Sequence, residues 1–192
     1  MENYETEETE EKVKVLLLSD LEDDKRSLIN NYSNWSDLIL NDLNSQSPKK
    51  KIKFFLWNTA NYMISAVPIN FFNHAKVIIF IYGITKKATF NSIKEKWYPF
   101  AEKYWENDHI LAVVGYKQEL YGNAEVRKDE GDKYAKEIRA FFYEVNSLDG
   151  GELHSLFTDI GRACLSKKKE EKEKKHGNYG ILRNCSCSCS CF

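Results

Sequence analysis

The sequence predicts an α/β fold of the doubly wound kind, in which one mostly parallel six-stranded sheet has helices on both faces and contains one antiparallel hairpin. Short, nearly continuous apolar runs of strand length recur along the chain, and amphipathic segments of helical period lie between the later runs. A cluster of turn-forming residues at Asn44–Pro48 separates two of the runs and predicts the hairpin. Sheets of this kind bind ligands at the carboxyl ends of their strands.

The predicted strands are the apolar runs themselves. They cover residues 13–18, 37–43, 51–57, 77–82, 110–114 and 141–145. The most apolar of them, Val77–Tyr82, is far shorter than the ~20 residues that a membrane-spanning helix needs. Contact with a membrane is therefore expected only through another part of the chain.

The predicted helices are segments whose apolar residues recur at helical spacing. They cover residues 25–32, 89–104, 129–140 and 151–165. The last of them shows the pattern clearly, with Leu153, Leu156, Phe157 and Ile160 on one face. Each of the later helices follows a strand, which is the arrangement expected of a parallel sheet.

Composition restricts the functions that are open to the chain. Its 192 residues suffice for one domain, and a formal net charge of −1 without a global basic field argues against nucleic-acid binding. Residues 1–12 hold six glutamates and no apolar run, which predicts a disordered, solvated acidic arm rather than a secretory signal. The internal Cys164 has no disulfide partner in the predicted domain, residues 13–166, which indicates a reducing compartment.

The last residues of the chain indicate a lipid anchor. Four cysteines alternate with serines at Cys185, Cys187, Cys189 and Cys191, and the final four residues fit the Cys-a-a-X prenylation pattern, whose terminal Phe192 favours geranylgeranyl. Cys189 and Cys191 are the predicted prenylation sites, and Cys185 and Cys187 are candidates for added palmitate. Two lipid groups hold a protein on a membrane far better than one does.

Two further features bear on this tail. Alternating cysteines also suit a thiolate metal cluster, although no histidine or second group of cysteines lies nearby to complete a tetrahedral site. Residues 167–176 carry mixed charge and either prolong the last helix or fray from it, and residues 177–182 are expected to be flexible. Residues 167–192 are therefore interpreted as a flexible tail that carries the anchor.

Four landmarks at the predicted strand ends resemble one family, the Rab-like small GTPases of the Ras superfamily. The most specific is Trp57-Asn58-Thr59-Ala60-Asn61, which resembles the family element Trp-Asp-Thr-Ala-Gly. The others follow in the family order, with Leu18–Ser27 at the phosphate loop, Gly115–Leu120 at the guanine-reading motif and Glu144–Leu148 at Glu-Thr-Ser-Ala-Lys. The resemblance implies a P-loop-type, Ras-like domain that binds GTP or GDP with magnesium.

The resemblance also assigns candidate nucleotide-binding residues. They are Lys25, Arg26, Ser27, Asn58, Asn61, Lys117, Glu119 and Ser147. In the phosphate loop only Lys25 keeps the family residue, while Asp24 replaces a glycine and Arg26 replaces the magnesium-binding hydroxyl. Carboxylates at Glu22, Asp23 and Asp24 would repel a triphosphate by ~4 kcal/mol for each unit charge at ~4 Å.

The other motifs depart from the family pattern as well. Asn58 replaces the Asp that orders the magnesium water, Asn61 replaces the Gly that meets the γ-phosphate, and Tyr62 replaces the Gln that orients the attacking water. Tyr116 stands where the family has the guanine-contacting Asn, and Glu119 stands where it has Asp. We therefore expect no catalytic residue and a nucleotide site that is weak or lost.

Simpler interpretations of the retained residues are equally open. Lys25 can begin a helix, Lys117 can be a solvated loop charge, and Thr59 can serve only to pack the end of a strand.

Three interpretations of function follow. The first is a divergent Rab-like protein, prenylated, bound to the cytoplasmic face of an intracellular membrane with a cytosolic pool when escorted, which acts in vesicle traffic by recruiting effectors. Its other partners would be the prenylation escort and transferase. The second is a slow but working GTP/GDP switch, and the third is a thiolate metal-binding tail on an inert α/β domain.

Overall fold

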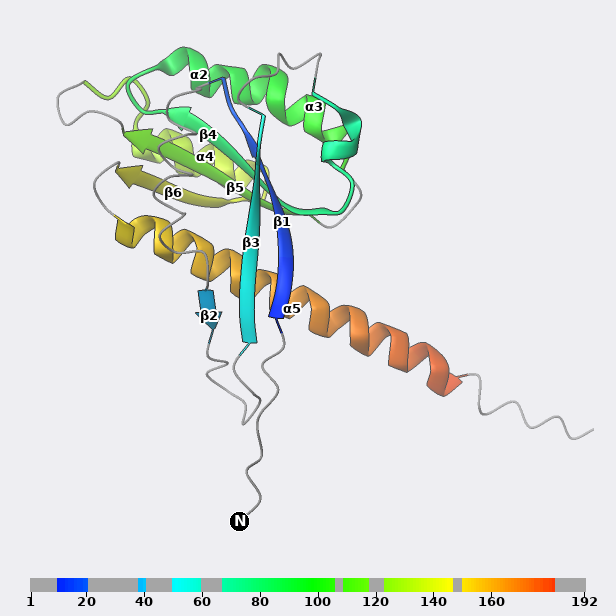
Figure 1. Cartoon of the computed structure of the whole chain (residues 1–192). Coiled ribbons are helices and arrows are strands. Elements are labelled where there is room, and N and C mark those ends of the chain that lie inside the picture. Colours follow the sequence, from blue (N-terminus) through cyan, green and yellow to red (C-terminus); the bar gives the residue numbers. More distant parts are fainter. Residues whose placement is uncertain are drawn as a thin grey trace, which may run out of the picture.

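The computed structural model describes residues 10–20, 38–40, 50–59, 67–105, 109–117, 123–146 and 150–181, with the backbone alone at 38–40, 50, 150 and 170–181. Strands and helices alternate along it (Figure 1). In chain order the elements are β1 (Glu10–Leu18), β2 (Leu38–Leu40), β3 (Lys50–Asn58), η2 (Ile69–Phe71), β4 (Ala75–Gly83), α2 (Lys87–Ser92), η3 (Ile93–Trp97), α3 (Tyr98–Glu102), β5 (Ile110–Lys117), α4 (Lys128–Glu137), β6 (Phe141–Asn146) and α5 (Gly150–Ile181).

The strands form one sheet in the order β2-β3-β1-β4-β5-β6. The strands β1 and β3 to β6 all pair in parallel, and the short β2 pairs with β3 in antiparallel register. An α/β domain with a mostly parallel sheet is thus confirmed, and each strand lies where an apolar run predicts it. The turn predicted at Asn44–Pro48 and the helix predicted at 25–32 lie outside the described residues.

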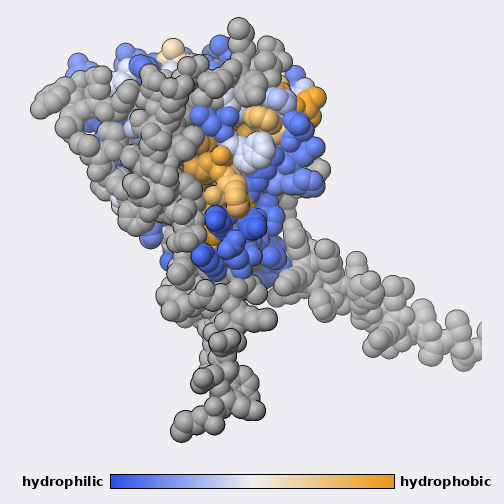
Figure 2. All heavy atoms as spheres, in the orientation of Figure 1, coloured by the Kyte–Doolittle hydropathy of each residue, from blue (hydrophilic) through white to orange (hydrophobic). Residues whose placement is uncertain are grey.

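The two faces of the sheet are covered differently (Figure 1). α5 packs on one face, while α2 and η3 lie against β4 on the other face, and α4 lies there against β5 and β6. In the part of the chain that the structure describes, these helices contact β4, β5 and β6, and they leave β3 and the N-terminal half of β1 uncovered on this face. We call this uncovered part the open side of the sheet. Figure 2 looks onto the open side, where apolar residues gather over β3 and β1 and hydrophilic residues lie below them.

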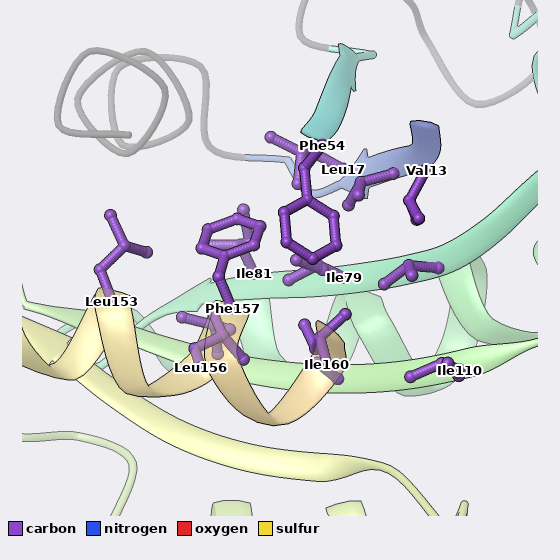
Figure 3. Close-up of a cluster of buried hydrophobic side chains, with 14 of the residues drawn as sticks. Val13, Leu17, Phe54, Ile79, Ile81, Ile110, Leu153, Leu156, Phe157 and Ile160 are labelled. Carbon is purple, nitrogen blue, oxygen red and sulfur yellow. The ribbon is translucent and has the colours of Figure 1, made fainter. Parts of the chain in front are cut away.

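The core beneath α5 is built from the alternation of the strands. Alternate residues of β1 and β3 face α5 and are buried, among them Val13, Leu17 and Phe54 (Figure 3). α5 meets them with its predicted apolar face, and the rings of Phe54 and Phe157 have centroids 5.2 Å apart. Leu156 is fully buried in the same cluster, as its place on that face predicts.

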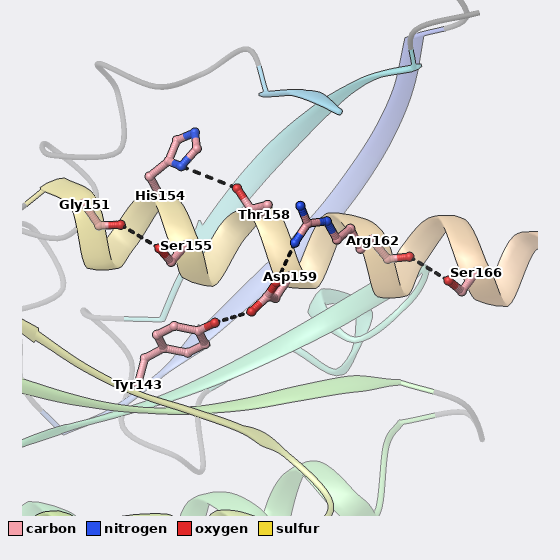
Figure 4. A network of polar contacts seen from close by, with 8 residues as sticks. All are labelled: Tyr143, Gly151, His154, Ser155, Thr158, Asp159, Arg162 and Ser166. Atoms are coloured by element: carbon pink, nitrogen blue, oxygen red, sulfur yellow. Dashed lines mark hydrogen bonds and ion pairs between the residues drawn. The ribbon is translucent and has the colours of Figure 1, made fainter. Parts of the chain in front are cut away.

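Polar contacts also hold α5 against β6 (Figure 4). The Tyr143 hydroxyl donates a hydrogen bond to the Asp159 carboxylate, and Arg162 Nη1 lies 3.2 Å from the other oxygen of that carboxylate. Burial, followed by the contact with Asp159, raises the pKa of Tyr143 to about 12. The same part of α5 therefore packs apolar side chains against the sheet on one side and, on the other, places Asp159 in a hydrogen bond with Tyr143 and an ion pair with Arg162.

The helix predicted at residues 89–104 is continuous from Lys87 to Glu102 but contains a wider π-helical turn at Ile93–Trp97. Pro99 follows in the first turn of α3 and has no N–H to donate to the preceding turn, which is where regular α-helical bonding gives way. Phe90, Ile93 and Trp97 are buried, as the predicted apolar face requires.

Two elements are longer than predicted. β1 begins at Glu10 rather than Val13, because Glu10 pairs in register with Lys51 and the Glu11 carboxylate bonds to Lys76 and Lys168. α5 continues to Ile181, well past its predicted end at residue 165. Residues 167–175 are all Lys or Glu, which are good helix formers and account for the extension. The helix also runs through residues 177–181, which we expected to be flexible and whose two glycines are poor helix formers.

Candidate functional site

The carboxyl ends of the parallel strands meet at one edge of the sheet, as the fold class predicts. Asn58 of β3 pairs in register with Leu17 of β1, and Lys117 of β5 pairs with Asn146 of β6. β1 and β4 lie between β3 and β5, and the register places Asn58 level with Ala112, five residues before Lys117. At ~4.8 Å per strand and ~3.3 Å per residue, Asn58 and Lys117 therefore stand roughly 22 Å apart. Of the predicted site residues, Asn58 and Lys117 are thus placed on the same edge but not in contact.

The remaining predicted site residues lie outside the described residues. They are Lys25, Arg26, Ser27, Asn61, Tyr62, Glu119 and Ser147, together with the tail cysteines Cys185, Cys187, Cys189 and Cys191. Their roles therefore stay predictions.

A cavity of about 140 Å³ opens at the β5 and β6 end of this edge. Its lining residues are Ile84, Lys117, Glu144, Val145, Asn146 and Glu152. The cavity is smaller than the ~300–1,000 Å³ of most ligand pockets, so these walls alone can hold only one end of a larger molecule.

Backbone hydrogen bonds fix the walls of this cavity. The Ile84 N–H donates to the Tyr116 carbonyl at 3.0 Å, and the N–H groups of Glu125 and Val126 donate to the Ile84 carbonyl at 3.0 and 3.1 Å. On the opposite wall the Asn146 N–H donates to Glu152 Oε2 at 3.2 Å. The end of β6 is thereby tied to the first turn of α5, where a carboxylate is also favoured by the helix dipole.

The charges that line the cavity are mixed. Burial raises the pKa of Glu144, the nearby Glu152 carboxylate adds to that shift, and Lys128 and Lys117 oppose it. A carboxylate that already lies beside another carboxylate holds its proton more readily, so this wall suits a ligand that offers hydrogen-bond donors rather than further negative charge.

Asp20 directly follows Ser19, at the start of the predicted phosphate loop, and its side chain turns toward the α2–η3 helix. One carboxylate oxygen accepts a hydrogen bond from Trp97 Nε1 at 2.7 Å, and the other accepts one from the Ser92 hydroxyl. Ser92 and Trp97 are almost fully buried while Asp20 is exposed, so the contact lies at the boundary between core and surface. Trp97, 77 residues further along the chain, therefore helps to fix the position of Asp20 at the end of β1.

Thr59 ties the end of β3 to β1. Its hydroxyl donates to the Leu17 carbonyl at 2.9 Å, and the residue is 1% exposed. This contact bears out the simpler interpretation of Thr59 as a residue that packs the end of a strand.

The described residues fit a guanine nucleotide with magnesium only in part. Lys117 lines the cavity where the resemblance puts a base, but Tyr116, in the position of the guanine-contacting Asn, is 2% exposed and packs in the core beneath α5. Tyr116 therefore presents no amide to a base in the cavity. We derive no chemical step that passes through a nucleotide.

Sequence reasoning missed several residues of this edge. Glu152 and Ile84 line the cavity without belonging to any quoted motif, and Ser92 gives no signal because its partner Asp20 is 72 residues away. Trp97 lies in the core, but its indole N–H also donates a hydrogen bond to Asp20, which its place in the predicted helix at 89–104 does not indicate.

The described residues show neither a metal-binding cluster nor a helix suited to cross a membrane. No group of three or more His, Cys, Asp or Glu side chains there is arranged to hold a metal ion. No helix in that part of the chain is both long and apolar enough to span a bilayer, α5 included.

The amino-acid sequence is similar to those of known proteins. Residues 29–166 match the Ras family. The chain is similar to the Ras-related protein Rab-12 of Mus musculus, with 31% identity over 120 residues that make up 62% of this chain and 49% of that protein, and it is equally similar to Rab-12 of Homo sapiens. It is also 34% identical over 121 residues, 62% of this chain and 55% of that protein, to the Ras-related protein Rab-5B of Dictyostelium discoideum. The matched region spans about half the length of these curated relatives.

Proposed function

Because the chain belongs to the Ras family of small GTPases, we propose that it is a divergent Rab-like protein that works by recruiting protein partners to a membrane in vesicle traffic. Its nucleotide site is weak or lost, and its anchor is a prenyl group on the C-terminal cysteines. Members of the family generally bind GTP or GDP with magnesium, which makes the loss of that site the distinctive part of the proposal.

The observation that carries the proposal is an exposed aromatic surface on the open side of the sheet. Trp57 and Phe55 of β3 are 43% and 41% exposed, and Ile69 of η2 is 57% exposed. Phe71 meets the Trp57 ring edge-on, with centroids 5.4 Å apart, and thereby holds that ring in place. Exposed apolar groups that are held rigidly and rimmed by charge are typical of protein interaction sites (Figure 2).

A weak nucleotide site is supported by the chemistry at the β5 and β6 end of the carboxyl edge of the sheet. Tyr116 is buried where the family reads guanine, and the cavity beside it carries the two carboxylates of Glu144 and Glu152. In the predicted phosphate loop, Asp24 and Arg26 replace residues that touch phosphate and magnesium. The family match itself begins at residue 29, beyond that loop.

The argument for the anchor rests on the tail sequence and on the length of α5. A helix of 32 residues is ~48 Å long at ~1.5 Å per residue, and in Figure 1 its C-terminal half projects beyond the sheet. Lipids on Cys189 and Cys191 would therefore attach at a distance from the exposed aromatic surface, which leaves that surface accessible to a partner.

The decisive test of the nucleotide site is mass analysis of purified full-length protein heated to release ligands. We expect no stoichiometric GDP or GTP. The double substitution Asp24→Gly with Arg26→Ser restores two loop positions, and we expect it to raise nucleotide affinity. Stoichiometric nucleotide in the wild-type chain would reject the proposal in favour of the slow GTP/GDP switch, in which Lys25, Lys117 and Glu119 suffice for binding. Turnover that disappears in Lys25→Ala would establish that switch.

The anchor has its own test. We expect Cys189→Ser with Cys191→Ser to release the protein from the membrane fraction of cells, whereas the matched pair Cys185→Ser with Cys187→Ser keeps at least the prenyl-dependent binding. Unmodified thiols in the native C-terminal peptide would contradict the anchor. Metal that is bound by the full chain and lost when residues 183–192 are deleted would support the thiolate metal-binding alternative instead.

A further inference from the structure

The open side of the sheet carries a strip of basic and aromatic side chains. Alternation along β1 and β3 directs every second residue away from α5, and these residues form what we call the outer face. Its charged and aromatic members are Glu10, Lys12, Lys14, Lys51, Lys53, Phe55 and Trp57, so lysines outnumber the one carboxylate. Figure 2 shows hydrophilic residues gathered over the lower part of β3 and β1, directly below the apolar ones.

Three lysines of the outer face, Lys12, Lys14 and Lys53, carry positive charge without a paired carboxylate among the described residues, although the Lys14 ammonium donates to the Asn73 carbonyl at 3.1 Å. Lys12 and Lys53 are partners in register, so two ammonium groups project side by side from adjacent strands. Lys14 lies over the Trp57 ring at 4.3 Å and Lys53 lies 5.9 Å from the Phe55 ring, but within the described ranges none of Lys12, Lys14 and Lys53 pairs with a carboxylate. The opposite face differs, since Glu11 there accepts both Lys76 and Lys168.

The same chain supplies a segment of complementary charge. Residues 1–9 hold Glu2, Glu5, Glu7 and Glu8 and contain no Lys or Arg. They lie outside the described residues but join β1 at Glu10, which pairs in register with Lys51 at one end of the outer face.

The length of this segment matches the length of the face. Nine extended residues reach ~30 Å at ~3.3 Å each. The distance from Glu10 to Leu16, the residue that pairs with Trp57, is ~20 Å along the strand. A chain that reverses direction just before Glu10 can therefore cover every lysine of the outer face and reach the aromatic end.

We propose that the acidic arm, residues 1–9, folds back on the outer face and is its resident occupant. Its carboxylates pair with Lys12, Lys14 and Lys53. The arm then competes with any protein partner that uses Trp57 and Phe55, a consequence that rests on the proposed function. The docking of the arm does not rest on it and is tested without any partner.

The test is paramagnetic relaxation in the full-length chain. The tail cysteines are replaced by serine, Tyr4→Cys carries a nitroxide label, and the buried Cys164 remains unlabelled. We expect the amide signals of residues 12–14 and 53–57 to lose intensity, while those of β5 and β6 do not. The loss should largely disappear at ~1 M salt, where the screening length falls to ~3 Å, and in the variant with Gln at positions 2, 5, 7 and 8.

Charge reversal provides the matched control. Lys12→Glu with Lys53→Glu should abolish the signal loss, and Glu5→Lys with Glu7→Lys and Glu8→Lys in the same chain should restore it. Lys96→Glu with Lys133→Glu, two exposed lysines on η3 and α4, should change nothing. All of these positions are at the surface or in the arm, so the variants should fold.

Three results would overturn the proposal. The first is equal signal loss over both faces, and the second is no loss at low salt. The third is loss transferred to an unlabelled chain in a mixed sample, which would make a second copy the occupant. As an independent measurement, a peptide of residues 1–9 should bind the chain that lacks them with a Kd on the order of 1 mM or below, since a short tether supplies millimolar effective concentration.

Discussion

The two faces of the β1–β3 strand pair differ in exposure, although they are formed by the same two strands. Val13, Leu17 and Phe54 point toward α5 and are buried, whereas Lys14, Phe55 and Trp57 point the other way and remain partly or largely exposed. A period of two residues is enough to place a sealed core and an accessible surface back to back. The contrast teaches that stability and binding can be assigned to separate faces of one strand pair, and it can be tested by substituting neighbouring residues.

The largest expected effect comes from the neighbouring phenylalanines of β3. Phe54→Ala removes a 4% exposed ring that packs on Phe157, and we expect it to lower the free energy of unfolding by about 3–5 kcal/mol. Phe55→Ala, one residue further along, should change it by only about 0.5 kcal/mol because that ring is 41% exposed. Urea denaturation of both variants measures the difference. Equal losses in the free energy of unfolding would contradict the assignment of Phe54 to the core and Phe55 to the exposed face.

A smaller effect is expected where α5 is locked to β6. Tyr143→Phe removes the hydrogen bond to Asp159 and should cost about 1–2 kcal/mol at neutral pH. The pKa of Tyr143 rises from 10.0 to about 12 on folding, so between those values the unfolded chain loses the Tyr143 proton first and the wild type loses stability as pH rises. The stability gap between wild type and variant should therefore narrow above pH 10, and a constant gap would contradict the contact.

Trp57→Ala addresses the exposed face. The ring contacts Phe71 and Lys14, so we expect a loss of only about 1 kcal/mol in the free energy of unfolding. Partner proximity in cells, measured by a biotinylating tag fused to the N-terminus, should fall severalfold, while Ile110→Val in the core should leave it unchanged. Unfolding of the variant at physiological temperature would show that the outer face also carries stability.

The smallest effect concerns Glu11, whose carboxylate receives Lys76 and Lys168 at 3.3 and 3.1 Å. Both lysines are about half exposed, so Glu11→Gln should cost less than about 1 kcal/mol. Thermal unfolding at low and high salt measures it, because the difference between wild type and variant should shrink as salt screens the pairs. A salt-independent loss would mean that Glu11 acts by packing.

Part of the candidate site could be anticipated from the chain alone. The motif that begins at Trp57 predicts a strand end, and Thr59 is found there with its hydroxyl on β1. The cavity wall of Glu152 could not be predicted, because no motif links the first turn of α5 to the end of β6. The contact between Asp20 and Trp97 could not be predicted either. The place of Trp97 on an apolar helical face indicates burial, but it does not indicate which acceptor the indole N–H will meet.

The sequence by itself determined the local structure. The short run Val77–Tyr82, rich in β-branched residues, indicates a buried strand, and the stripe of Leu153, Leu156 and Phe157 at a period of 3.6 residues indicates one face of a helix. Only the tertiary structure decided which face of β1 and β3 α5 would cover, and hence that Phe54 is buried while Trp57 is exposed. That choice depends on how distant segments pack. The period along a strand shows which residues share a face, but it does not show which helix will cover that face.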